Sequence, residues 1–154
     1  MRLRCLPAAL VALAMMSCGD DFATGELGPA RVQYPGEWVQ EPLDGLGWDQ
    51  SVVMRPRSLA PDQQELFVQL SYSRGGRSGY EAQIGAAKDS PNPVAPLEID
   101  VPGASTSYAY RDGGLVSHVY ALSENMRFSV YLQVNARGNE TLDVGRTLES
   151  FELG

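Results

Sequence analysis

The chain has 154 residues, of which 44% are hydrophobic and 20% are charged, and its formal net charge at pH 7 is −7. An acidic balance of this size argues against binding to nucleic acid and against docking on anionic lipid headgroups, since both use surfaces rich in Lys and Arg. The one histidine, His118, cannot form a zinc site alone, and nothing in the sequence indicates a cofactor.

The N-terminal segment has the pattern of a secretory signal peptide. Arg2 and Arg4 precede an apolar run of 11 residues, 6–16, which is too short to cross a roughly 30 Å hydrocarbon core as a helix. The ending Met-Met-Ser-Cys at 15–18, followed by polar residues, resembles the lipobox of bacterial lipoproteins. That resemblance implies cleavage before Cys18 and a diacylglycerol on its thiol.

An alternative remains open at this segment. The lipobox pattern prefers Leu where this chain has Met15, and an ordinary signal peptide cut after Ala14 would leave Cys18 as a free thiol. Cleavage before Cys18 leaves 154 − 17 = 137 residues with a charge of 10 − 19 = −9, because two of the 12 basic residues are removed. Two or three acyl chains hold a protein on a bilayer without any transmembrane helix.

The domain organisation follows from composition. Residues 1–17 are the expected lipoprotein signal peptide, and 18–29 are rich in Gly and acids without periodicity, which predicts a flexible acidic tether. Residues 30–153 are expected to form one α+β domain.

Alternating apolar residues predict most of this domain to be strand. Asp112-Gly113-Gly114 predicts one hairpin turn and residues 123–125 a second. Pro96 confines its segment to a sheet edge. The expected strands are 31–34, 37–39, 48–55, 65–73, 93–101, 106–111, 115–123 and 126–135, with a short last strand within 150–153.

Two helices are expected. Ser78 with Glu81 forms a capping-box pattern for a helix over 79–88, and Asn139 is the expected N-cap of a helix over 140–149. If the second helix lies on the sheet, the sequence predicts which of its residues are buried. These are Leu142, Leu148 and Phe151, with Gly145 at the contact and with Arg146 and Glu149 in solvent.

Two short motifs resemble the Mog1/PsbP-like superfamily, which includes DcrB-related bacterial lipoproteins. They are Tyr-Pro-Gly-Glu-Trp at 34–38 and Leu-Glu-Ser-Phe at 148–151. The resemblance implies an antiparallel sheet of about six strands sandwiched by helices. It supplies no catalytic residues, and members of the superfamily serve as assembly factors, small-GTPase partners, secretion chaperones and envelope proteins.

Candidate catalytic groups are few. No G-x-S-x-G motif accompanies His118, which is expected to be a partly buried, hydrogen-bonded strand residue. Glu37, Glu98 and Asp100 are candidates for the paired carboxylates of a glycan hydrolase, and this enzyme remains the alternative function.

The leading hypothesis is a non-catalytic lipoprotein of the bacterial cell envelope, with its domain in the periplasm. It is anchored to the membrane through Cys18 and binds a protein partner or a small apolar ligand. Tyr and Trp are favoured at interfaces because they bring a large contact area at low entropy cost. The candidate partner contacts are Trp38, Trp48, Tyr80 and Tyr110.

Overall fold

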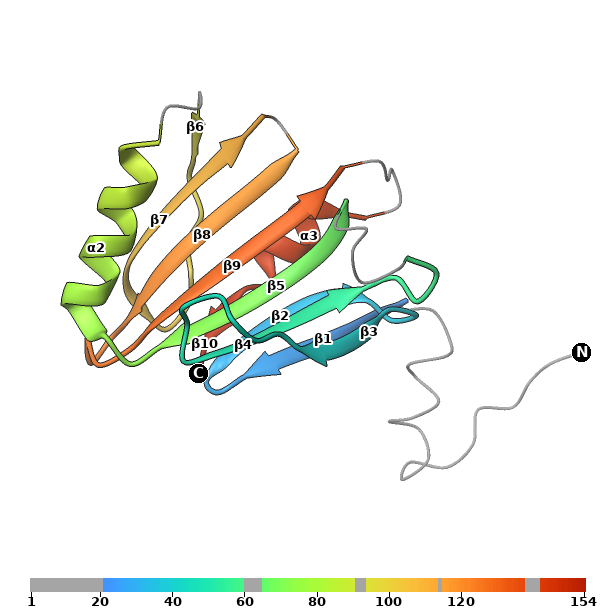
Figure 1. Cartoon of the computed structure of the whole chain (residues 1–154), viewed down its shortest axis with the longest axis horizontal. Coiled ribbons are helices and arrows are strands. Elements are labelled where there is room, and N and C mark those ends of the chain that lie inside the picture. The colour runs from blue at the N-terminus through green and yellow to red at the C-terminus, as the bar shows by residue number, and fades with distance from the viewer. Residues whose placement is uncertain (1–20, 60–64, 91–93, 114, 138–141) are drawn as a thin grey trace, which may run out of the picture.

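A computed structural model describes residues 21–59, 65–90, 94–113, 115–137 and 142–154, and it confirms an α+β fold of mostly antiparallel sheet (Figure 1). The described part contains ten strands in two sheets, more than the six or so expected. The strands are β1 (Phe22–Leu27), β2 (Ala30–Pro35), β3 (Val39–Pro42), β4 (Gln50–Arg55), β5 (Leu66–Ser73), β6 (Val94–Leu97), β7 (Ala104–Asp112), β8 (Val116–Ser123), β9 (Ser129–Ala136) and β10 (Glu152–Leu153). The helices are α2 (Gly76–Lys88) and α3 (Val144–Glu149).

The larger sheet has seven strands in the order β3-β4-β5-β9-β8-β7-β6, and all its neighbouring pairs are antiparallel. The two predicted hairpins are confirmed as the β7–β8 and β8–β9 pairs. β6 lies at an edge, as predicted from Pro96, which has no N–H to donate to a second neighbour.

One face of this sheet carries the main hydrophobic core. Val68 and Leu70 of β5, Val119 of β8 and Leu132 of β9 point to it and are fully buried. The first six residues of β5 are buried, so both faces of this strand are covered there. The strand lies inside the sheet between β4 and β9. The alternation of residue types along β5 therefore separates two buried faces of the strand, and it does not separate a buried face from an exposed one.

The smaller sheet has the order β1-β2-β10, and its first strand lies where a flexible tether was expected. Residues within 18–29 were predicted to be a flexible spacer, but Phe22–Leu27 is a strand that pairs with β2 along its whole length. Its sequence lacks apolar alternation, so its stability comes from the partner strand and from the burial of Leu27. Gly25 allows close packing there, since a Cβ on it would lie 3.0 Å from Met54 Cε.

α2 begins earlier than predicted, and its expected capping box is wrong. The N-cap is Gly75, and the Ser78 hydroxyl donates to the Gly75 carbonyl instead of capping a backbone N–H. Glu81 instead pairs with Arg77 one turn before it, at 2.9 Å. The helix starts from Gly76 at φ +59°, a left-handed conformation that glycine adopts without strain.

α3 is shorter than predicted. Its N-cap is Asp143, whose side chain accepts from the Arg146 N–H; Asn139 lies outside the described residues. Leu142, Leu148 and Phe151 are buried, as predicted.

Two other expectations for this helix are wrong. Gly145 is exposed and is not at the contact. Arg146 is half-buried, with its guanidinium carbon 3.9 Å from the centre of the Phe22 ring, whereas Glu149 is exposed as predicted. Both corrections have one cause. The helix starts at Val144, so its buried side is formed by Thr147 and Leu148, while Arg146 is turned towards β1.

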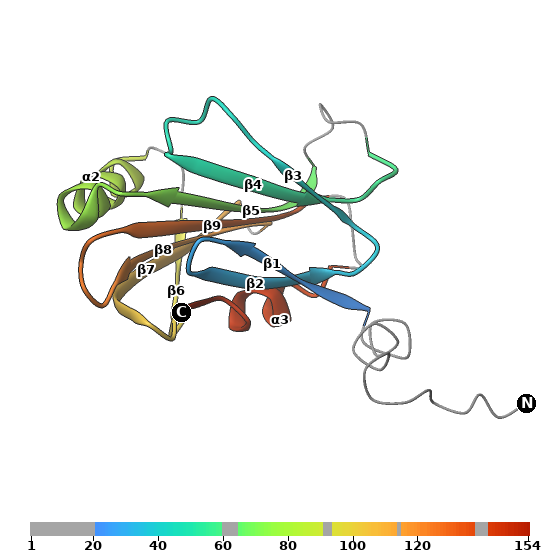
Figure 2. The same ribbon diagram turned by 90° about the horizontal axis from the view of Figure 1, so that it is seen from below.

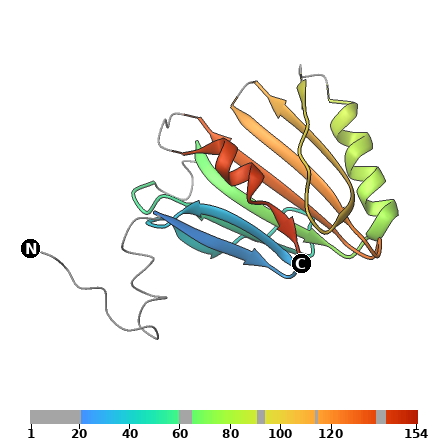
Figure 3. The same cartoon turned by 180° about the vertical axis from the view of Figure 1, so that it is seen from behind.

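The layers are visible when the molecule is turned. Figure 2 shows the small sheet and α3 together on one side of the large sheet, and Figure 3 shows them from behind, in front of that sheet. α2 contacts β8 and β9 and packs on the opposite face, where its Tyr80 hydrogen-bonds Thr106 of β7.

Candidate functional site: an aromatic cluster on the second sheet face

The face of the large sheet opposite the main core carries a cluster of rings on β7, β8 and β9. We call it the aromatic cluster. Alternation along each strand brings its side chains to one face, and the register places Tyr110 opposite His118 and Tyr120 opposite Tyr131. Its members are Trp48, Tyr110, His118, Tyr120 and Tyr131.

The rings are close to parallel. The centroid distance is 4.6 Å for Tyr110 and His118 and also 4.6 Å for Tyr120 and Tyr131, with interplanar angles of 15° and 21°. Trp48, from the connection between β3 and β4, stacks on Tyr131 at 5.5 Å. Aromatic pairs at such separations each contribute about 0.5–1.5 kcal/mol beyond the area that they bury, so the cluster is a rigid surface.

Hydrogen bonds fix the tautomer of the histidine. The Tyr131 hydroxyl donates to Gln133 Oε1 at 3.1 Å, and it lies 2.6 Å from His118 Nδ1. Since this hydroxyl has one proton, His118 donates from Nδ1 to the Tyr131 oxygen. His118 Nε2 is then a lone-pair acceptor, and it is buried without a partner among the described residues.

Burial shifts the pKa values in the cluster towards the neutral forms. It lowers the pKa of His118, and the negative charge of Asp112 opposes this only in part. Burial raises the pKa values of Tyr120 and Tyr131; the negative charge of ionised Tyr110 adds to both rises, and that of ionised Tyr120 adds to the rise at Tyr131. At neutral pH the cluster is therefore an uncharged surface that can stack and hydrogen-bond.

The structure separates the four candidate partner contacts. Trp38, Tyr80 and Tyr110 are 8%, 5% and 7% exposed, so they offer a partner almost no surface. Trp38 belongs to the main core and Tyr80 faces the sheet from α2, whereas Tyr110 is packed inside the aromatic cluster. Only Trp48 is half-buried and keeps an accessible part.

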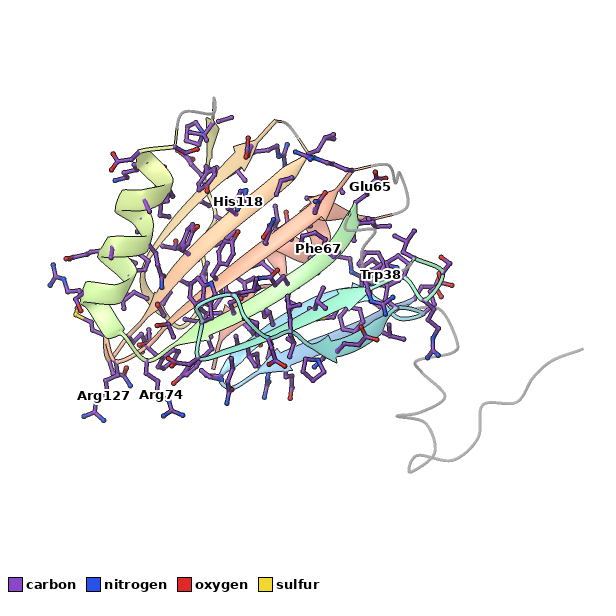
Figure 4. All side chains as sticks on the ribbon, viewed as in Figure 1. Trp38, Glu65, Phe67, Arg74, His118 and Arg127 are labelled. Carbon is purple, nitrogen blue, oxygen red and sulfur yellow. The ribbon has the colours of Figure 1, made fainter. Side chains whose placement is uncertain are left out.

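His118 is half-buried and hydrogen-bonded, as predicted. Figure 4 shows it on the sheet beside α2, far from Trp38. That His118, Tyr120 and Tyr131 form one cluster could not be predicted from the sequence. The alternation on each strand indicated the shared face, but the register between strands was needed to bring these rings together.

Glu37 lies far from the other two candidate carboxylates. Glu37 lies two residues before β3, at one edge of the large sheet, and Glu98 and Asp100 follow β6, at the other edge. Six strand spacings correspond to roughly 25–30 Å, whereas glycosidase carboxylates lie about 5–9.5 Å apart. All three side chains are exposed.

The described ranges contain no group of three or more His, Cys, Asp or Glu residues placed to hold a metal ion. In the same ranges, no helix has both the length and the hydropathy to cross a bilayer. Cys18 lies outside the described residues.

No protein-family model matches the sequence, and no curated protein matches it.

Proposed function

We propose that this protein is a lipoprotein of the bacterial cell envelope, anchored by acyl chains on Cys18, with a periplasmic domain that binds a protein partner without catalysis. The aromatic cluster is the observation that carries the binding role. It presents half-buried Trp48, His118 and Tyr120 on a rigid, uncharged face, and Tyr and Trp are enriched among residues that dominate binding energy.

The contacts of the cluster favour binding over catalysis. His118 donates from Nδ1 to the Tyr131 hydroxyl and stacks on Tyr110, so in this arrangement it does not take the proton of Tyr131 as a general base would. The Mog1/PsbP-like architecture is part of the same proposal. It is supported by the antiparallel sheet, by helices on both of its faces and by the burial of Phe151 in the closing motif.

The anchor is tested by replacing Cys18 with Ala in the full chain. The variant is expected to leave the membrane pellet or to keep its N-terminal segment, and mass spectrometry of the wild type should find acyl groups on Cys18. A Cys18→Ala protein that is cleaved normally and still sediments with membranes in high salt would contradict the anchor.

The binding role is tested by affinity capture from solubilised membranes with wild type, Trp48→Ala and the matched control Met126→Ala. Met126 is 46% exposed on the β8–β9 hairpin, outside the cluster. Loss of a central aromatic contact costs about 2 kcal/mol or more, so Trp48→Ala should recover at least about tenfold less of the specific partner, and Met126→Ala should recover the wild-type amount. Turnover in a hydrolase screen that disappears when Glu37, Glu98 and Asp100 are replaced would favour the enzyme instead.

A further inference from the structure

The strand that replaces the expected tether constrains how the domain meets the membrane. β1 is held from its first residue, because the Gly36 N–H donates to the Asp21 carbonyl and Phe22 pairs with Pro35. The guanidinium of Arg146 covers the Phe22 ring at 3.9 Å. The fold therefore fixes the chain from residue 21 onward.

Only three peptide units join Cys18 to Asp21. Consecutive Cα atoms are about 3.8 Å apart, so whatever path the chain takes, these two residues lie within about 11 Å of each other. The glycerol of an acylated cysteine lies at the level of the lipid headgroups, since its chains are buried in the bilayer.

We infer that the end of the domain around Asp21, Phe22, Gly36 and Glu37 is a membrane-facing surface that is held against the headgroups by this short connection. The inference rests on the proposed acylation of Cys18. This surface is expected to contact the bilayer, because the chain between the anchored Cys18 and the folded domain is so short. A surface depression of about 520 Å³ lies at this end and is lined by these residues and Ala23.

The opposite end of the domain then points away from the membrane. Glu37 leads into β3, whose Val39 pairs with Arg55 at the end of β4, while Gln50 at the start of β4 pairs with Tyr72 near the end of β5. Strand β5 has 8 residues and spans about 23 Å over its seven steps. Figure 1 shows α2 at the end opposite to the start of β1, and Figure 4 shows Arg74 and Arg127 pointing outward there.

Two positions make a matched pair for measuring this orientation. Glu37 and Arg127 are both exposed and lie in connections between strands. Figure 4 shows Arg127 at the end of the domain opposite to Trp38, the residue next to Glu37. The proposed processing removes Cys5 and acylates Cys18, and the chain has only these two cysteines. Glu37→Cys or Arg127→Cys would then be the one free thiol of the mature lipoprotein.

The experiment uses the purified lipidated protein in phosphatidylcholine vesicles with a fraction of lipid that carries a nitroxide on its headgroup. A small fluorophore on Glu37→Cys should be quenched several-fold more strongly than the same fluorophore on Arg127→Cys. A 12-residue Gly/Ser insertion between Asp20 and Asp21 adds about 20 Å of mean reach and should reduce quenching at position 37 towards the value at 127.

The outcomes separate the two proposals. Equal quenching at both positions, stronger quenching at 127, or no effect of the insertion would overturn the orientation and leave the lipid anchor in place, provided that mass spectrometry finds the acyl groups. Their absence from Cys18 would overturn the anchor and the orientation together.

Discussion

Phe151 shows how much stability a single side chain carries in this fold. It is fully buried in the main core, although it lies between α3 and β10, outside any helix or strand. Phe151→Ala should lower the free energy of unfolding by about 3–5 kcal/mol, a large part of the roughly 5–15 kcal/mol of a typical domain. The check is chemical denaturation of residues 21–154. The neighbouring exposed Glu152→Ala should change the value by less than about 0.5 kcal/mol, and equal midpoints for the two variants would contradict the core role of Phe151.

His118 should make the stability of the domain depend on pH. Burial lowers its pKa in the folded state, so as pH falls the unfolded chain binds a proton first, near pH 6.5, and the folded state is disfavoured. The contribution is therefore fully present above about pH 6.5 and is lost as pH falls from there towards the lower folded-state pKa. Urea midpoints between pH 7.5 and 5.5 should fall more for the wild type than for His118→Gln, which cannot titrate. Parallel pH profiles would show that His118 is not desolvated.

At the residue scale, burial could be predicted where it depends on local spacing and not where it depends on tertiary packing. Leu142, Leu148 and Phe151 followed from the pattern around one helix. The burial of Trp38 and Tyr80 did not. Trp38 lies in a bend without a periodic pattern, and among the 13 residues of α2 Tyr80 is the one large side chain that is buried, beside Gly76 and Ala87.

At the scale of elements, strands with strong alternation and Gly-rich turns were predictable. β5 was predicted within one residue, and the β7–β8 hairpin matches its Asp112-Gly113 turn. β1 was missed, because Thr24, Gly25 and Glu26 give no apolar alternation and the strand depends on β2. The start of α2 was missed for a similar reason, since Gly75 and Gly76 begin the helix through backbone conformation and not through a capping side chain.

Replacing two different glycines by Ala should change the stability of the domain in opposite directions. Gly103 precedes β7 at φ +80°, and a Cβ there would meet the Leu153 carbonyl oxygen at 1.8 Å. Gly103→Ala must therefore displace β10 and should destabilise the domain by several kcal/mol, of the order known for forbidden backbone conformations and lost packing. Gly85, in α2, has nothing within 4 Å of such a Cβ, so Gly85→Ala should stabilise the domain by up to about 1 kcal/mol. Thermal or urea denaturation measures both, and two changes of the same sign would contradict the prediction.

At the scale of the whole molecule, the boundary of the folded unit lies earlier than composition suggested. A fragment of residues 30–154 matches the predicted domain but lacks β1, which contributes buried Leu27 and one side of the small sheet. It should be less stable than residues 21–154 by on the order of 3 kcal/mol or more, from the lost burial and the lost backbone ladder. Denaturation midpoints of the two fragments test this.

A matched control separates the strand from its surface charges. Glu26 and Arg31 form an ion pair between β1 and β2 at 3.3 Å, with side chains that are 61% and 57% exposed. Glu26→Ala in the 21–154 fragment should therefore change stability by no more than about 1 kcal/mol. Equal unfolding midpoints for the two fragments would contradict the stabilising role of β1 and would support the prediction that residues 22–29 are a spacer.

The position of β10 has a consequence for the order in which the chain can fold. Glu152 and Leu153 pair with Arg31 and Ala30, and the Leu153 N–H donates to the Pro102 carbonyl. Because synthesis starts at the N-terminus, this edge of β2 stays open until β10 has been synthesised. Contacts that are so distant in sequence form late. During synthesis the small sheet therefore stays incomplete, and the core stays unfilled at the position of Phe151, until residues 151–153 have been made.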